Sequence, residues 1–203
     1  MSLYIPSQFK SESRDEALAL IRAAPFATLI TSVAEQEPHI THLPLLLLEE
    51  GQLTGHMARA NPHWQAFASG HTAAIFHGPH AYISPRWYVN PAREVPTWNF
   101  ATVHVHGKPV LIDDATAKLS VVDATSAAFE PAENPWQRQL DEARLQALLG
   151  AIVAFHIPLT RLEAKFKMNQ NKTPQDCAQV IAGLRASGQA DALATAEWMQ
   201  KHE

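Results

Sequence analysis

Short polar turns between β-branched, apolar segments are the feature that most constrains the fold of this chain. "FATLITSV" at 26–33 and "HITHLPLLLL" at 39–48 are separated only by "AEQEP", and "LTGHMA" follows at 53–58. β-branched and aromatic residues favour strands. Connections this short join antiparallel neighbours, because a parallel pair needs a long crossover. The pattern therefore predicts a three-stranded antiparallel meander.

Later stretches continue the same pattern, and helices are inserted among them. Further strands are predicted at 72–78, 80–84, 97–112 with a bend or turn at Gly107–Lys108, and 151–168. Helices are predicted from a capping box at Ser13 and Glu16 to Pro25, at 61–70, from Asp113 or Asp114 to about 129, at about 135–149, and once or twice after Thr173. Six to eight strands with late helices predict a mainly β protein of the α+β class, with an antiparallel sheet or barrel.

This order of elements predicts two parts. Residues 1–172 form the β domain with helices inserted at about 114–149, and residues 173–203 form a C-terminal helical extension. No internal repeat or low-complexity segment interrupts this organisation.

Composition narrows the classes of protein that fit. Of the 203 residues, 46% are hydrophobic and 18% charged, and no apolar run approaches the roughly 20 residues that span a bilayer. The single cysteine, Cys177, excludes an internal disulfide and a thiolate metal cluster, so we expect a cytoplasmic protein. A net charge of −4 argues against a surface that grips DNA, which needs clustered Lys and Arg.

"GHMARANPHW" at 55–64 is the first candidate binding site. Asn61 is a good N-cap with Pro62 at the first helical position, and Arg59 stands directly before them. A helix N-terminus presents unpaired N–H groups, and a guanidinium there can bind the same anion. The alternative is an ordinary surface arginine before an ordinary capped helix.

A second candidate is "RLEAKFKMNQNK". Lys165 and Lys167 alternate with Phe166 and so point to one side of a strand, and the amide cluster 169–171 follows. Amides can read the edge of a flat heterocycle. An anion pocket, lysines and amides on a β scaffold suit a phosphorylated aromatic cofactor, although a solvated strand and a polar turn give the same string.

Aromatic and histidine side chains offer weaker signals. In "PTWNF", Trp98 and Phe100 share one strand face, which can wall a planar ligand or simply belong to the core, and Asn99 lies on the other face. His104 and His106 share a face and are a possible metal pair, but no established metal-ligand spacing surrounds them, so no metal is assigned. No nucleophile elbow, phosphate loop or dinucleotide fingerprint is present, so no catalytic residues are assigned.

Several of these stretches together resemble the PaiB family, which is described as FMN-binding negative transcriptional regulators. They are "LYIPSQF", "FATLITS", "THLPLLL", "GHMARANPHW", "IFHGPHAYISPRWY", "VPTWNFATVHVHGKPV" and "AIVAFHIPLTRLEAKFKMNQNK", in order over about residues 3–185. The resemblance implies an antiparallel split β-barrel, related in fold to pyridoxamine-phosphate oxidase and flavin reductase domains. It also implies a homodimer with FMN in a groove between the subunits.

The resemblance further implies roles for individual residues. The FMN phosphate would be held by Arg59 and the N-terminus at Asn61, with charge added by Lys165 or Lys167 of either subunit. The other implied contacts are His42, Leu43 and Pro44 to the flavin ring, His56 and Met57 beneath the ribityl chain, and Trp98, Asn99, Gln170 and Asn171 at the ring edge.

Four activities fit such a protein. The flavin of a regulator would sense redox state or be structural. An FMN-dependent oxidoreductase would act on a small substrate, and a haem-binding split barrel would use one of the 11 histidines as axial ligand. Direct DNA binding would show a steep salt dependence.

Overall fold

The structure is a computed structural model that describes residues 3–11, 13–49 and 51–201. The chain divides into two compact units. The terminal unit comprises Met1–Leu20, His77–Val103 and Glu163–Glu203, and the central unit comprises Ile21–Phe76 and His104–Leu162. The predicted boundary between a β domain and a helical extension at residue 172 stays a prediction.

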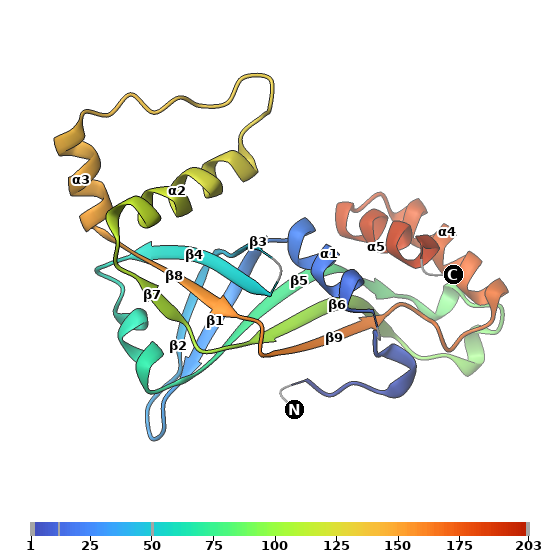
Figure 1. Ribbon diagram of the computed structural model, residues 1–203. Coiled ribbons are helices and arrows are strands. Elements are labelled where there is room, and N and C mark those ends of the chain that lie inside the picture. The colour runs from blue at the N-terminus through green and yellow to red at the C-terminus, as the bar shows by residue number, and fades with distance from the viewer. Residues whose placement is uncertain (1–2, 12, 50, 202–203) are drawn as a thin grey trace. The chain divides into compact units, whose positions relative to one another are not determined.

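Nine strands within the described residues form two sheets (Figure 1). One has the order β2-β1-β5-β6-β9 and the other the order β3-β4-β8-β7. The strands are β1 (Phe26–Ser32), β2 (His39–Pro44), β3 (Leu46–Glu49), β4 (Gln52–Ala58), β5 (His71–Ile83), β6 (Thr97–His106), β7 (Val110–Ile112), β8 (Ile152–Pro158) and β9 (Arg161–Lys167). The pairs β1–β2, β1–β5, β3–β4, β4–β8 and β7–β8 are antiparallel, which confirms the predicted sheet type.

The core of the central unit follows from strand alternation. Leu53 and Met57 of β4 and Phe155 and Ile157 of β8 are buried, with exposed fractions of 5% or less. Successive side chains of a strand point to opposite faces, so Thr54, His56 and His156 lie on the other face of the sheet. α2 (Ala115–Phe129) contacts both of these strands.

One predicted strand, 39–48, is broken in the structure. β2 ends at Pro44, and Leu45, which is fully buried, donates its N–H to Pro25 O (2.9 Å) before β3 begins in the other sheet. Proline cannot donate a ladder hydrogen bond, so it suits the end of a strand. A Cβ at Gly55 of β4 would come within 2.7 Å of the Leu45 side chain, so the close approach at this corner requires glycine.

The converse holds for the strands predicted at 72–78 and 80–84, which form the single strand β5. Thr72, Ala74 and Phe76 are buried, whereas beyond Gly78–Pro79 the buried residues are Ala81 and Ile83. The alternation therefore shifts by one residue at Gly78–Pro79, as in a β-bulge.

Helix ends follow the capping signals of the sequence. Asp114 accepts from Ala117 N–H (2.7 Å) at the start of α2, and Thr173 Oγ1 accepts from Asp176 N–H (3.1 Å) at the start of α4 (Pro174–Ser187). α3 (Glu142–Gly150) begins after Asp141 and not near 135, so that part of the prediction is wrong. The remaining elements are α1 (Arg14–Ala23), α5 (Ala190–Lys201), and the 3-10 helices η1 (Ser7–Phe9), η2 (Pro62–Ala68), η3 (Pro85–Trp87) and η4 (Pro91–Arg93).

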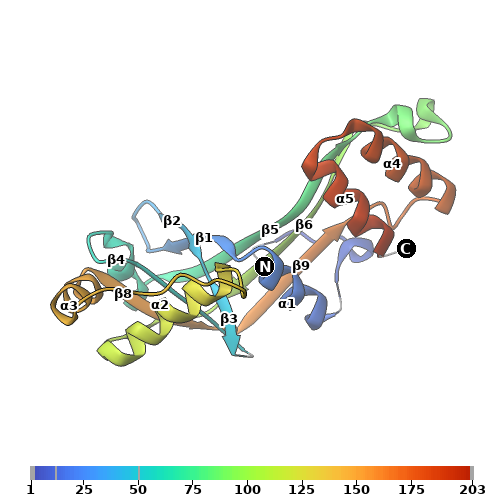
Figure 2. The same ribbon diagram turned by 90° about the horizontal axis from the view of Figure 1, so that it is seen from above.

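The C-terminal helices belong to the terminal unit. α4 and α5 pack side by side, as both views show (Figures 1 and 2). α4 also lies against η3, where the Trp87 ring occupies the space that a Cβ at Gly183 would need (2.5 Å). No helix in the described part of the chain combines the length and apolar character required to span a membrane.

Candidate functional site

Arg59 lies in the central unit directly after β4, and its exposed side chain is held by backbone carbonyls. Nε donates to Gly150 O (2.8 Å) and Nη2 to Ile152 O (3.0 Å), and the guanidinium lies 5.9 Å from the Trp64 ring centroid. Because Gly150 is the last residue of α3, the cation also meets the negative end of that helix. Nη1 has no acceptor among the described residues, so this edge of the guanidinium remains available to an anion.

Asn61 combines capping with a tertiary contact. Its Oδ1 accepts from His63 N–H (3.0 Å), and its Nδ2 donates to Thr41 Oγ1 of β2 (3.0 Å). The helix that it caps, η2, is a seven-residue 3-10 helix and not an α-helix. Such a short segment adds little dipole, so Arg59 is the main cationic group at this point.

His63 is the centre of a buried polar network that the sequence analysis missed. Its side chain is 1% exposed, and its ring nitrogens lie 2.8 Å from Thr41 Oγ1 and 2.8 Å from Thr31 Oγ1. Thr31 in turn bonds Thr72 (2.8 Å), and the His39 ring stacks on His63 at 5.5 Å. Burial, reinforced by the charge of His39, lowers the pKa of His63 to about 4, so the imidazole is neutral at pH 7.

The sequence gives only a faint signal for this network. That signal is a histidine two residues after an N-cap, in a chain with threonines on its strands. In three dimensions, the network joins the start of η2, two residues after Arg59, to Thr41 of the edge strand β2. β2 is the terminal strand of its sheet, so alternate N–H and C=O groups point away from β1.

Neighbouring residues of the predicted ring contacts lie on opposite strand faces. His42 is exposed, with its Nδ1 3.2 Å from Thr28 Oγ1, whereas Leu43 is buried. On β4, Met57 lies in the core and His56 is half-buried on the other face, where burial lowers the pKa of the imidazole. One ligand on the outer face of β2 could contact His42 and Pro44 by their side chains, but not Leu43.

Trp98 and Asn99 belong to the terminal unit and are separated in the same way. Trp98 is 54% exposed and stacks on His80 (6.3 Å, 30°). Asn99 is fully buried, and its Nδ2 donates to Met199 Sδ of α5 (3.4 Å). Its Oδ1 has no hydrogen-bond partner among the described residues.

Lys165 and Lys167 share a face of β9, as the alternation predicts. Lys165 Nζ donates to Tyr4 O (2.9 Å), and Lys167 Nζ donates to Thr97 Oγ1 and to Trp98 O (2.7 Å). Neither ammonium has a carboxylate within ion-pair distance among the described residues. Burial, and then the nearby charges of Lys165 and Lys172, lower the pKa of Lys167.

The predicted amide cluster builds a turn. Gln170 accepts from Met168 N–H (2.7 Å) and donates to Phe166 O, so its side-chain amide is committed to the backbone. Asn169, with a positive φ of 66°, pairs with the Tyr88 hydroxyl in a buried contact. Asn171 is exposed. Of this cluster, only Asn171 keeps its side chain available to a ligand.

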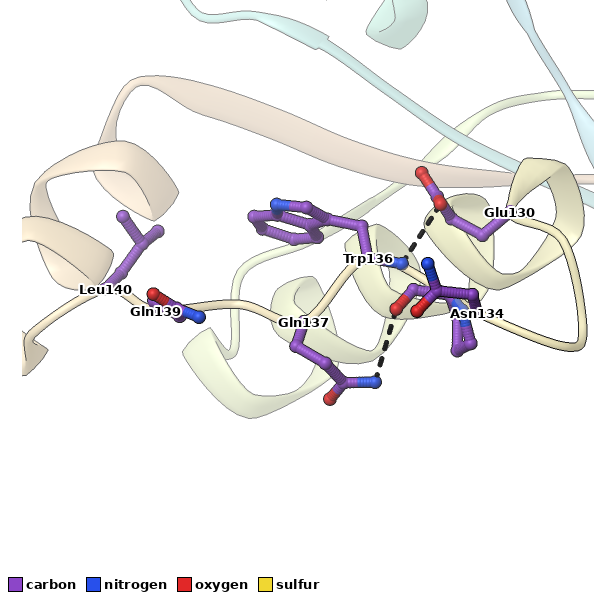
Figure 3. A pocket seen from close by; sticks show the side chains of 7 residues that line it. Glu130, Asn134, Trp136, Gln137, Gln139 and Leu140 are labelled. Carbon is purple, nitrogen blue, oxygen red and sulfur yellow. Dashed lines mark hydrogen bonds between the residues drawn. The ribbon is translucent and has the colours of Figure 1, made fainter.

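A large surface recess, of about 570 Å³, lies in the connection between α2 and α3 (Figure 3). Its lining residues are Glu130, Asn134, Pro135, Trp136, Gln137, Gln139 and Leu140. Glu130 accepts from Trp136 N–H (3.0 Å), and the lining contains no cation. It therefore does not suit a phosphorylated ligand.

Comparison with known proteins assigns a family model and relatives to this chain. A family described as "Putative FMN-binding domain" matches residues 3–161. The chain is 33% identical over 207 residues to the Bacillus subtilis "Protease synthase and sporulation protein PAI 2", covering 98% of this chain and 97% of the relative. It is also 29% identical to an uncharacterized protein of Emericella nidulans, with 83% and 85% of the two chains covered.

Two solved structures have the same fold as this chain, at low sequence identity to it. An "FAD and Heme binding protein" from Mycobacterium smegmatis superimposes with a TM-score of 0.63 at 17% identity, over 83% of this chain and 78% of that one. The flavocytochrome Anf3 from Azotobacter vinelandii superimposes with a TM-score of 0.61 at 16% identity, over 78% and 69%. These likenesses confirm the predicted antiparallel split-barrel fold.

Proposed function

Because the chain belongs to the FMN-binding domain family of PaiB-type proteins, with FMN as cofactor, we propose that FMN binds between Arg59 and the outer side of β2. Arg59 contacts the phosphate through the guanidinium edge that the carbonyls of Gly150 and Ile152 leave available. The flavin ring lies along the outer edge of β2 beside His42 and Pro44. The observation that carries this placement is the pair of hydrogen bonds by which Asn61 and His63 join the segment after Arg59 to Thr41 of β2.

The residues present there suit each part of FMN. A guanidinium binds phosphate in a forked geometry. The free N–H and C=O groups of an edge strand can pair with the polar edge of the ring, and exposed apolar and imidazole side chains can cover its face. When bound, FMN supplies reversible uptake and release of electrons. The chain positions it and, through the neutral His63 network, keeps the loop that carries Arg59 in place.

We further propose that FMN lies at a homodimer interface. Phe26 and Ile40 are 65% and 56% exposed, and their register partners across β1 and β2 are Pro44 and Ile30. All four lie on one face, on either side of the Thr28–His42 pair. Such an apolar strip at a sheet edge is expected to be covered, and a second copy of the strip would cover it symmetrically. Ile40→Glu should then yield monomers in sedimentation, whereas Val95→Glu, at a loop position 71% exposed, should not.

The proposed biological role is negative transcriptional regulation. In this role the flavin governs the activity of the protein, and the protein does not bind DNA directly. The B. subtilis relative is named for protease synthesis and sporulation, and the net charge of −4 here disfavours a DNA-binding surface. Anisotropy titration with duplex DNA should show no binding at 200 mM salt. A strain that lacks the gene for this protein should regain repression of its target genes when wild type is supplied, but not when the Arg59→Ala variant is supplied. FMN-dependent NAD(P)H oxidation by the purified protein would instead favour an oxidoreductase.

The decisive experiment for the FMN site compares FMN with riboflavin, which lacks the phosphate. Apo-protein is titrated with each, and flavin fluorescence is measured for wild type, Arg59→Ala and the control Arg144→Ala, an exposed arginine of α3. A charge-assisted hydrogen bond contributes about 1.5–3 kcal/mol, so Arg59→Ala should weaken FMN about 10- to 100-fold. Riboflavin affinity should change little. Equal losses for both flavins would mean that Arg59 only supports the fold, and the proposed phosphate site would be wrong.

A further inference from the structure

The connection between α2 and α3 contains the recess of about 570 Å³ that Figure 3 shows, and this recess has a chemistry of its own. Its lining residues all lie within residues 130–140 of the central unit. The volume falls within the usual range of small-molecule sites. The family resemblance assigns none of these residues to FMN, so a ligand here would be additional to the flavin.

Local hydrogen bonds and two prolines define the shape of this connection. Asn134 donates its N–H to Pro131 O (3.3 Å), and Trp136 donates its N–H to Glu130 Oε2 (3.0 Å), the second of which is drawn in Figure 3. Pro131 and Pro135 restrict the backbone further, because the proline ring fixes φ. The Glu130 carboxylate is therefore held beside the backbone of Trp136.

Trp136 presents an uncovered indole at the recess. It is 57% exposed and lines the recess together with Leu140, which is 39% exposed. In Figure 3 the indole ring extends from its backbone in the direction of Leu140. The face of an aromatic ring attracts a cation, and among the aromatic side chains the indole does so most strongly. The ring and the leucine also offer apolar surface to an alkyl chain.

Negative charge gathers at the Glu130 side of the recess. Glu130 Oε1 has no hydrogen-bond partner among the described residues, because the bond to Trp136 uses Oε2. Glu130 is also the C-cap of the 15-residue helix α2, and the C-terminal end of a helix carries partial negative charge. The next residue, Pro131, has no N–H with which to cap the last carbonyls. The carboxylate and the helix end therefore favour a cation at the same place.

The arginine of this connection does not supply that cation. Arg138 donates through Nη1 and Nη2 to the two carboxylate oxygens of Asp123 on α2, with an Nη2–Oδ2 distance of 3.2 Å. Its charge is thus already neutralised, and the pair lines a neighbouring recess of about 340 Å³. Within the described part of the chain, no lysine or arginine lines the larger recess.

Amide side chains add hydrogen-bond acceptors to the lining. Asn134, Gln137 and Gln139 all line the recess. Gln137 donates its Nε2 to Pro135 O (3.4 Å), so its Oε1 is left as an acceptor. A primary ammonium group can donate three hydrogen bonds to such oxygens and to a carboxylate, whereas a quaternary ammonium group has no N–H to donate. The lining therefore favours a primary ammonium group.

We propose that this recess binds a small aliphatic amine in its ammonium form. The ammonium group donates to Glu130 and faces the Trp136 indole, and the alkyl chain extends toward Leu140. This site shares no residue with the FMN site proposed at Arg59 and β2, so each can be tested without the other.

Titration of the full-length protein with hexylammonium tests the proposal. NMR of the tryptophan indole N–H groups locates the binding, because the Trp136 signal is the one that is absent from Trp136→Leu. We expect this signal to shift saturably while the other indole signals stay in place. Calorimetry gives the affinities. Hexanol, which lacks the charge, and hexanoate, which reverses it, should bind about fivefold more weakly or not at all, and hexyltrimethylammonium should also bind more weakly.

Variants separate the charge from the ring. Glu130→Gln keeps an acceptor for the Trp136 N–H but removes the charge, so it should weaken hexylammonium about three- to fivefold and leave hexanol unchanged. The control Glu37→Gln, at an exposed position between β1 and β2, should change neither affinity. Trp136→Leu should weaken hexylammonium about two- to fivefold, and Trp136→Phe should weaken it less. Asp123→Asn leaves Arg138 without its partner and should weaken hexylammonium by repulsion.

Melting of each variant identifies any that fail to fold, and the wild-type comparison of hexylammonium with hexanol needs no variant. No saturable shift of the Trp136 signal, equal affinities for hexylammonium and hexanol, or an unchanged affinity in Glu130→Gln would overturn the proposal. Nα-acetyl-lysine methylamide carries the same alkyl ammonium group on a peptide backbone. Tighter binding of this probe than of hexylammonium would mean that the recess receives a lysine side chain of a protein, and the small-amine proposal would be wrong.

Discussion

Acid should weaken the central unit through His63, because the folded chain keeps this imidazole neutral. A histidine of an unfolded chain has a pKa near 6.5, whereas burial lowers the pKa of His63 to about 4. Between these pH values the unfolded state binds more protons, so the free energy of unfolding falls as the pH falls. The stability linked to neutral His63 is therefore complete above pH 6.5 and is lost progressively down to about pH 4.

The size of the effect follows from the same two values. At about 1.4 kcal/mol per pH unit, the interval from 6.5 to about 4 corresponds to about 3–4 kcal/mol. About 2 kcal/mol of this is lost by pH 5. The side chain is 1% exposed and both ring nitrogens face hydroxyl groups, so solvent screens little of the penalty. A loss of this size is a large part of the stability of an ordinary domain.

The assay is urea unfolding of wild type and His63→Gln at pH 8, 7, 6 and 5. Gln keeps hydrogen-bonding groups but does not titrate, so the stability advantage of wild type should shrink by about 2 kcal/mol between pH 8 and pH 5. His71→Gln, at an exposed position, controls for the loss of one histidine. NMR titration of the His63 ring should show no protonation above pH 5. A constant advantage across these pH values, or a ring that titrates near 6.5, would refute the reasoning.

Two further predictions concern packing and hydrogen bonds of the central unit. Gly107→Ala should lower the free energy of unfolding by about 2 kcal/mol or more, because its Cβ would collide with the backbone oxygen of Pro158. In Gly150→Ala the new Cβ meets nothing within 4 Å, so this variant should be neutral or slightly stabilising. Melting temperatures of the two variants check this, and equal values would contradict it. Thr41→Val should cost about 1–3 kcal/mol, because it leaves two polar side chains without a shared partner. Thr28→Val, whose hydroxyl bonds the exposed His42, should change urea stability by less than about 0.5 kcal/mol; similar costs at both positions would count against the network.

Elements whose signals are local could be predicted from the sequence. β-branched runs and short turns identify β1 and β4, and the caps Asp114 and Thr173 mark where α2 and α4 begin. One error occurred where a distant contact decided the local conformation. The run 39–48 breaks at Leu45 because Leu45 bonds Pro25 and packs beside Gly55.

The candidate site shows the same limit more strongly. The motif "GHMARANPHW" marked Arg59 and Asn61, but nothing in it indicates that Arg59 bonds carbonyls 91 and 93 residues away. It also does not indicate that His63 bonds threonines of two other strands. Residues adjacent in sequence, such as His42 and Leu43, were predicted as joint contacts, although strand alternation turns their side chains to opposite faces.

The sequence by itself therefore determined the kinds of element, their order, the antiparallel connections and the family, because these depend on short-range propensities and on stretches that can be compared directly. Only the tertiary structure decided which polar groups are already satisfied and which face outward. Hydrogen-bond partners and burial arise from residues brought together across the chain. Arg59, His63 and Lys165 are all polar in the sequence, but one is held by a helix end, one is sealed in a neutral network, and one lies against aromatic rings without an acidic partner.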